Sequence, residues 1–88
     1  MKHLNISVIG EVQGVSFRYH ALKKASSMGI SGFVKNESDG TLYIEAEGPE
    51  DTLKKFIQWA KSGPMFASVE KLLVKEGELK NFKSFEIL

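Results

Sequence analysis

Apolar and polar residues alternate along several stretches of the chain, and this two-residue period is typical of strands with one buried face. Residues 4–8 and 42–46 show the pattern most clearly, so each range predicts a strand. Residues 31–35 and 67–75 have the same character. Residues 85–87 predict a short last strand or extension.

Between these stretches the spacing of apolar residues changes to that of a helix with one buried face. The first helix is expected from about Phe17 to Met28, because Gly29 suits the position just past a helix end. A second helix is expected to open at Pro49, a residue that fits the first helical position, and to end at residues 62–64, Ser-Gly-Pro.

The order of elements is therefore strand, helix, strand, strand, helix, strand, with a hairpin at residues 36–40 marked by an Asp-Gly pair. Right-handed crossovers put both helices on one face of the sheet. We predict an α+β fold of the ferredoxin-like type, a two-layer sandwich (βαββαβ) with an antiparallel sheet whose second strand lies at an edge. Residues 1–88 form a single domain in this interpretation.

The amino-acid composition limits the kinds of chemistry that the chain can perform. The chain has 88 residues, 42% of them hydrophobic, and no cysteine, which excludes disulfides, thiolate catalysis and cysteine-bound metal. Its net charge of +1 provides no broad field for nucleic acid or an anionic membrane. The N-terminus has no long apolar run. We therefore expect a cytoplasmic protein without membrane or nucleic-acid partners, and a monomer by default.

Residues 10–18 form a glycine-containing loop that leads from the first strand into the first helix. The first N–H groups of a helix lack partners, and with such a loop they can cradle an anion. Gly14 would allow close approach of the backbone, and Arg18 offers a planar set of donors for two phosphate oxygens. The same residues also fit a tight turn beside a surface arginine, so the loop alone leaves both interpretations open.

Asn36 directly precedes the hairpin loop. Its amide could hold a water molecule without placing a negative charge beside a phosphate. Asparagine next to such a turn more commonly caps or shapes the hairpin. The residue alone does not decide between these roles.

Together, the two segments resemble the signatures of the acylphosphatase family, and the similarity extends over essentially the whole chain. The first signature is matched by Gly10, Val12, Gln13, Gly14, Val15, Phe17 and Arg18. The second is matched by Gly32, Phe33, Val34, Lys35, Asn36, Gly40, Leu42 and Gly48. The chain departs from the family pattern at Glu37, Ser38 and Met65.

The resemblance implies hydrolysis of acyl phosphates to carboxylate and inorganic phosphate, with phosphate as product and competitive inhibitor. It implies that Arg18 and Asn36 are catalytic, Arg18 binding the phosphate and Asn36 orienting the attacking water. No cofactor and no metal are expected. The implied phosphate-binding residues are Gln13, Gly14, Val15, Ser16, Phe17 and Arg18.

Other candidate residues are expected to have structural roles. His3 and His20 are interpreted as surface or partly buried side chains, because no further metal ligands accompany them. Glu45 and Glu47 share one face of a strand, and we expect that face to be solvated.

Two alternative functions stay open. RNA-recognition domains share the element order, but their full aromatic motif and a basic surface are missing here. An acylphosphatase-like regulatory or carbamoyl-phosphate-handling domain normally belongs to a longer chain. The absence of attached domains and of zinc-binding cysteines argues against it.

Overall fold

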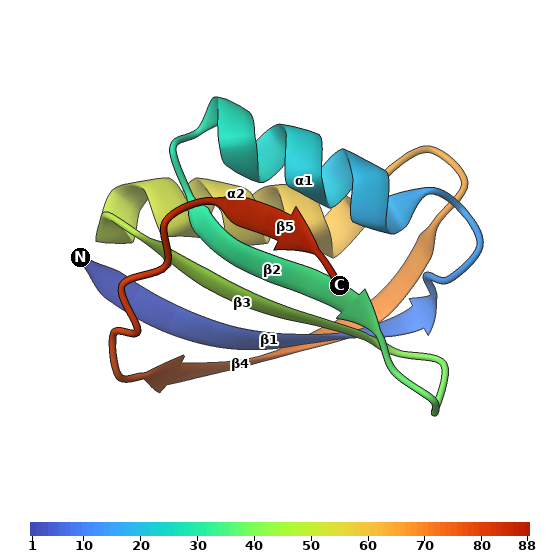
Figure 1. Cartoon of the computed structure of the whole chain (residues 1–88). Helices are drawn as coiled ribbons and strands as arrows, with labels where there is room; N and C mark the ends of the chain where they lie inside the picture. The colour runs from blue at the N-terminus through green and yellow to red at the C-terminus, as the bar shows by residue number, and fades with distance from the viewer.

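Five strands form one sheet, and two helices cover one of its faces (Figure 1). The computed structural model describes all 88 residues. In chain order the elements are β1 (Lys2–Glu11), α1 (Phe17–Ser27), β2 (Ser31–Asn36), β3 (Leu42–Gly48), α2 (Glu50–Ser62), β4 (Ser68–Gly77) and β5 (Phe85–Ile87). The strands lie side by side in the order β4-β1-β3-β2-β5. The predicted ferredoxin-like sandwich is confirmed.

The sheet differs from the prediction at one edge, because β5 pairs in parallel with β2 while every other pair is antiparallel. The expectation that β2 lies at the edge was therefore wrong. Gly32 N–H donates to the Ser84 carbonyl and Leu88 N–H to the Val34 carbonyl, both at 2.9 Å, so hydrogen bonds hold the added strand from end to end. Its Phe85 is buried.

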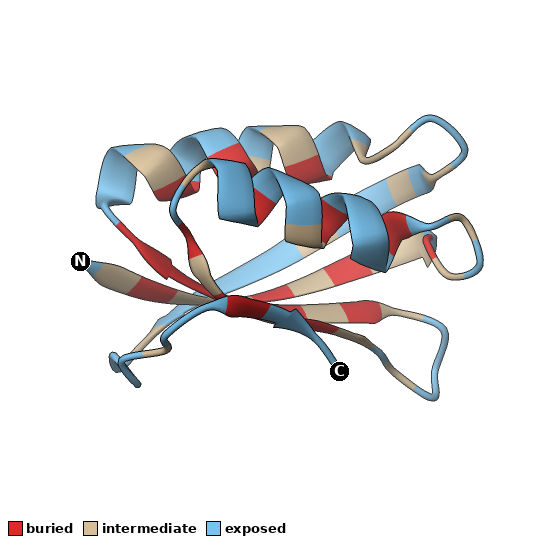
Figure 2. Cartoon of the chain, turned by 45° about the horizontal axis from the view of Figure 1, so that its top comes forward, coloured by how far each residue is buried: buried red, intermediate tan, exposed pale blue.

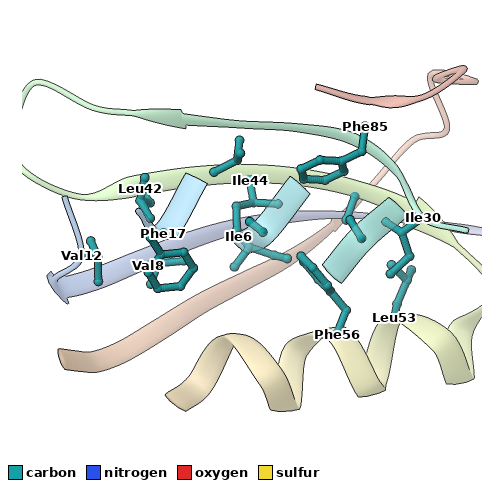
Figure 3. Close-up of a cluster of buried hydrophobic side chains, with 14 residues drawn as sticks. Ile6, Val8, Val12, Phe17, Ile30, Leu42, Ile44, Leu53, Phe56 and Phe85 are labelled. Atoms are coloured by element: carbon teal, nitrogen blue, oxygen red, sulfur yellow. The ribbon is translucent and has the colours of Figure 1, made fainter. Parts of the chain in front are cut away.

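The core lies between the helices and the sheet. Helix residues that face the sheet are buried and those on the outer side are exposed (Figure 2). Phe17 of α1 and Phe56 of α2 enter this layer, and Ile6 and Ile44 of the central strands lie opposite them (Figure 3). Neither helix is long and apolar enough to cross a membrane.

The sheet face opposite the helices is not fully solvated. Residues 78–84, which connect β4 to β5, pass along the end of the sheet near the N-terminus (Figure 1). Beneath this connection His3, Glu45 and Glu47 are buried, with 1%, 6% and 2% of their surfaces exposed. The expectations of a solvated Glu45–Glu47 face and of an ordinary His3 were therefore wrong. Strand alternation predicts which face a residue occupies, but not which segment covers that face.

Glu47 is the centre of this buried cluster. Its Oε2 lies 2.7 Å from Nδ1 of His3, and its carboxylate accepts the N–H groups of Lys80 and Phe82. Burial alone would raise the pKa of Glu47, but the hydrogen bonds from Lys80, His3 and Phe82 together hold that pKa below its usual value. The carboxylate thus fastens the 78–84 connection to β3.

Candidate functional site

The first half of the site is made where β1 leaves the sheet. The register between β1 and β4 shifts between Ile9 and Gly10, because Glu70 is an extra residue on β4 at this point. Gly10 has φ of 140°, and a Cβ there would lie 2.1 Å from the Ser68 carbonyl oxygen. Only glycine fits this position. β1 ends one residue after Gly10, and the chain then leads from the end of the sheet to α1.

The loop between β1 and α1 exposes its backbone donors. Gly14 and Ser16 adopt positive φ angles of 74° and 61°. None of the N–H groups from Gln13 to Tyr19 donates to an acceptor in the protein; the first that does is that of His20, to the Ser16 carbonyl at 3.1 Å. No atom lies within 4 Å of a Cβ built on Gly14, so this loop is open to a ligand. Such free amides at a helix N-terminus favour an anion.

Two buried side chains hold this loop at its ends. Val12 and Phe17 are each only 1% exposed. The Phe17 ring packs edge-on against the Trp59 ring, with ring centres 5.5 Å apart. Arg18 follows Phe17 in the first turn of α1, is exposed, and takes part in none of the ion pairs of the structure. Its guanidinium is therefore free to bind an anion delivered to the loop.

The second half of the site is the end of β2, where Asn36 pairs with Leu42 of β3. The hairpin turn is closed by other groups. The Asp39 carboxylate accepts the Thr41 hydroxyl at 2.7 Å and the Thr41 N–H at 3.0 Å, and these bonds lower the pKa of Asp39. The Asn36 side chain makes no hydrogen bond within the protein and is exposed. Asn36 therefore does not cap the hairpin, which removes the structural role that its sequence position suggests.

The two halves meet in a cleft of about 420 Å³. The loop after β1 and the hairpin after β2 lie at the same end of the sheet, toward which β5 also points (Figure 1). The lining residues are Val12, Gly14, Ser16, Phe17, Arg18, Tyr19, Asn36 and Ile87. They include a guanidinium and an amide but no carboxylate, which suits a doubly charged anion.

Two of the candidate phosphate-binding residues do not line the cleft. Val15 packs against the hydrophobic core. The Gln13 side chain turns to the hairpin, where its Nε2 donates to the Glu37 and Thr41 carbonyls at 2.8 and 2.9 Å. For both, only the backbone N–H stays available to a ligand. Sequence reasoning missed Tyr19 and Ile87 in the lining.

A larger cleft, of about 620 Å³, lies between α2 and the strands β1 and β4. Its rim is charged, but Lys2 pairs with Glu50 and Glu76, and Lys54 pairs with Glu50. Lys55 and Lys61 are in no ion pair, but this cleft contains neither a loop of free amides nor an arginine. The smaller cleft is therefore the candidate active site.

Comparisons with known proteins point to one family. A model of the acylphosphatase family matches residues 4–87. An acylphosphatase of Archaeoglobus fulgidus is 50% identical over 84 residues, which are 96% of this chain and 94% of that protein. The crystal structure of acylphosphatase from Bacillus subtilis superposes with a TM-score of 0.97 at 39% identity, covering 100% of this chain and 99% of that one. HypF of T. kodakarensis contains a similar region, with a TM-score of 0.83 at 33% identity, but the match covers 99% of this chain and only 12% of that one.

Proposed function

Because the chain belongs to the acylphosphatase family and is an acylphosphatase enzyme, we propose that its cleft hydrolyses acyl phosphates by direct attack of water, with Arg18 holding the phosphate and Asn36 orienting the water. One observation carries this proposal: the free amides of the loop, an unpaired arginine and an unpaired asparagine line one cleft that contains no carboxylate. The substrate is a small molecule, and inorganic phosphate is both product and competitive inhibitor.

The phosphate binds to two kinds of donor in this mechanism. The N–H groups of Gln13, Gly14, Val15, Ser16 and Phe17 surround its oxygens, and the Arg18 guanidinium pairs with two of them. The backbone set is fixed before the substrate arrives, because the buried Val12 and Phe17 hold the loop. Donors that need no rearrangement stabilise the charge of the transition state most effectively.

The Asn36 amide places the attacking water. An amide carries both a donor and an acceptor, so it can bind the water while staying neutral beside the phosphate. As the water oxygen forms its bond to phosphorus, the bond from phosphorus to the acyl oxygen breaks and a carboxylate leaves. A phosphate oxygen takes the proton of the water. A carboxylate is a stable leaving group, so positioning and charge stabilisation suffice.

The test is hydrolysis of benzoyl phosphate by the wild type and two variants. Arg18→Ala should raise KM and weaken inhibition by phosphate, because it removes a charged donor from the binding site. Asn36→Ala should lower kcat by about 100-fold, the order of loss when a reacting group is misplaced, and leave inhibition by phosphate nearly unchanged. Lys24→Ala is the matched control for charge, since Lys24 is exposed near the other end of α1 and outside the cleft. Full activity in either site variant would refute the mechanism.

We also propose that residues 1–88 act as one domain, as a cytoplasmic monomer. The nearly complete overlap with the Archaeoglobus and Bacillus proteins supports a single domain over residues 1–88. Sedimentation at concentrations used in the assay should give the mass of a single chain, and a stable dimer would contradict this proposal.

A further inference from the structure

The side chain of Gln13 lies between the two halves of the cleft without lining it. We propose that Gln13 is a positioning residue for Asn36: its amide fastens the hairpin to the loop after β1 and so fixes the distance between the water-orienting group and the phosphate. This inference rests on the proposed function, because it assigns Gln13 an effect only through Asn36.

Gln13 contacts both strands of the hairpin next to Asn36. Its Nε2 donates at 2.8 Å to the carbonyl of Glu37, the next residue after Asn36. It also donates at 2.9 Å to the carbonyl of Thr41, the residue before Leu42, which is the pairing partner of Asn36 across the hairpin. One amide group therefore holds both arms of the hairpin at the point where Asn36 leaves the sheet.

No other hydrogen bond joins the loop to the hairpin. The pairing of β1 with β3 ends at Val8 and Leu42, and beyond that point β1 pairs only with β4. The backbone bonds of the hairpin are internal: Glu37 N–H donates to the Thr41 carbonyl and Gly40 N–H to the Glu37 carbonyl. Without the Gln13 amide, the hairpin base and the loop would be held together by packing alone.

The chemistry of the contact requires a primary amide. Two carbonyl oxygens face the Gln13 side chain, and a terminal NH₂ group can donate one hydrogen to each. Methionine has a similar length but no donor, and glutamate would direct its charge at two acceptors. Asparagine is shorter by one methylene group. Gln13 is half-buried, so the lost bonds would not be fully replaced by bonds to water.

Gln13→Met is the principal variant, studied alone and together with Asn36→Ala on benzoyl phosphate. The backbone amides and Arg18 remain in place, so we expect inhibition by inorganic phosphate to stay within twofold of the wild type. We expect kcat to fall by about tenfold or more, since a shift of about 1 Å at a reacting group has effects of this order. In the Asn36→Ala background, Gln13→Met should change kcat by less than twofold, because the group it positions is gone.

Asp39→Ala is the matched control within the same hairpin. It removes the side-chain bonds to Thr41 that close the turn but keeps both bonds of Gln13. We expect it to leave kcat within twofold of the wild type. If it lowers kcat as much as Gln13→Met does, general loosening of the hairpin explains both effects and the proposal for Gln13 is wrong.

The outcomes separate this proposal from the proposed function. If Asn36→Ala abolishes activity and Gln13→Met has wild-type kcat, only the role of Gln13 is overturned. An equal loss in both backgrounds, or a parallel change in phosphate inhibition, overturns it too. If Asn36→Ala is fully active, the mechanism and this inference fail together. Should Gln13→Met not fold, Gln13→Asn is tested by the same measurements, with the same pattern expected.

Discussion

Replacing Glu47 by glutamine should destabilise the protein strongly, although Glu47 lies outside the candidate active site. Glu47 is 2% exposed, and its two oxygens serve three groups: Nδ1 of His3 and the N–H groups of Lys80 and Phe82. Glutamine has nearly the same shape but only one acceptor oxygen. Its NH₂ group must therefore face at least one of these partners where the carboxylate accepted a bond.

The size of the effect follows from these contacts. A buried donor left without an acceptor costs about 1–3 kcal/mol. The remaining bonds also lose the strength that a charged acceptor gives, which is about 1 kcal/mol for each. Since removing one member of a buried charged cluster costs about 3–5 kcal/mol, we expect Glu47→Gln to lower the free energy of unfolding by about 3 kcal/mol. For a domain of this size, that lowers Tm by more than about 10 °C.

Unfolding in urea, followed by Trp59 fluorescence and far-UV circular dichroism, measures this loss. Glu50→Gln is the matched control, because Glu50 is exposed and pairs with Lys2 at 3.8 Å and Lys54 at 3.6 Å. Surface pairs of this kind contribute less than about 1 kcal/mol. If the two variants lose the same stability, or if Glu47→Gln stays within about 1 kcal/mol of the wild type, the cluster beneath the 78–84 connection does not stabilise the fold as argued.

The same variant has a predicted pH dependence. Because the pKa of Glu47 in the folded state lies below the value of 4.5 for a free glutamate, its contribution to stability is complete above pH 4.5. That contribution is lost as the pH falls through the lower folded value. The stability difference between the wild type and Glu47→Gln should therefore be constant above about pH 5.5 and shrink at more acidic pH. A difference that grows on acidification would contradict this sign.

Two further predictions concern the end of β1 and the loop that follows it. Gly10→Ala should destabilise the protein by more than about 2 kcal/mol in urea unfolding, because the added Cβ would lie 2.1 Å from the Ser68 carbonyl oxygen. Gly40→Ala is the control: nothing lies within 4 Å of its Cβ, so it should cost only the strain of its positive φ. Equal losses of stability in the two variants would refute the steric argument. Inorganic phosphate should raise the Tm of the wild type in a concentration-dependent way, because a ligand stabilises the state that binds it. It should raise the Tm of Arg18→Ala much less. Equal shifts in Tm would mean that phosphate binds elsewhere.

The fold was largely predictable because apolar residues recur at regular spacings along most of its strands and helices. Alternation over residues 4–8 and 42–46 predicted two central strands, and the helical spacing after Phe17 predicted α1. β5 has only three residues, too few for a period to predict its parallel pairing with β2. The 78–84 connection has no regular structure, so nothing in the pattern indicated that it covers Glu47.

The candidate site was predictable in a different way. The glycine loop suggested an anion site before Arg18, but no local pattern indicated that Asn36 lies beside it; that pairing came from the resemblance to a family. Tyr19 and Ile87 enter the cleft through tertiary structure alone, Ile87 because β5 aligns with β2. The Gln13 contacts span 24 and 28 residues, and one side chain carries no sequence signal for bonds of that range.

The two ends of β1 have separate tasks. His3, near its start, belongs to the buried cluster, and the chain beyond Glu11 forms the loop of the candidate active site. Eight residue steps separate them, which is about 26 Å in an extended strand. Groups that far apart with no shared partner affect stability and function nearly independently.

β5 is the element that could connect these ends, because it follows the 78–84 connection and brings Ile87 to the cleft. It has anchors of its own: it pairs with β2, and its buried Phe85 packs against Phe56 with ring centres 6.3 Å apart. We therefore expect folded Glu47→Gln, assayed well below its Tm, to keep the wild-type kcat on benzoyl phosphate. A lower kcat in the fully folded variant would mean that the connection positions Ile87, so that the cluster and the cleft act as one unit.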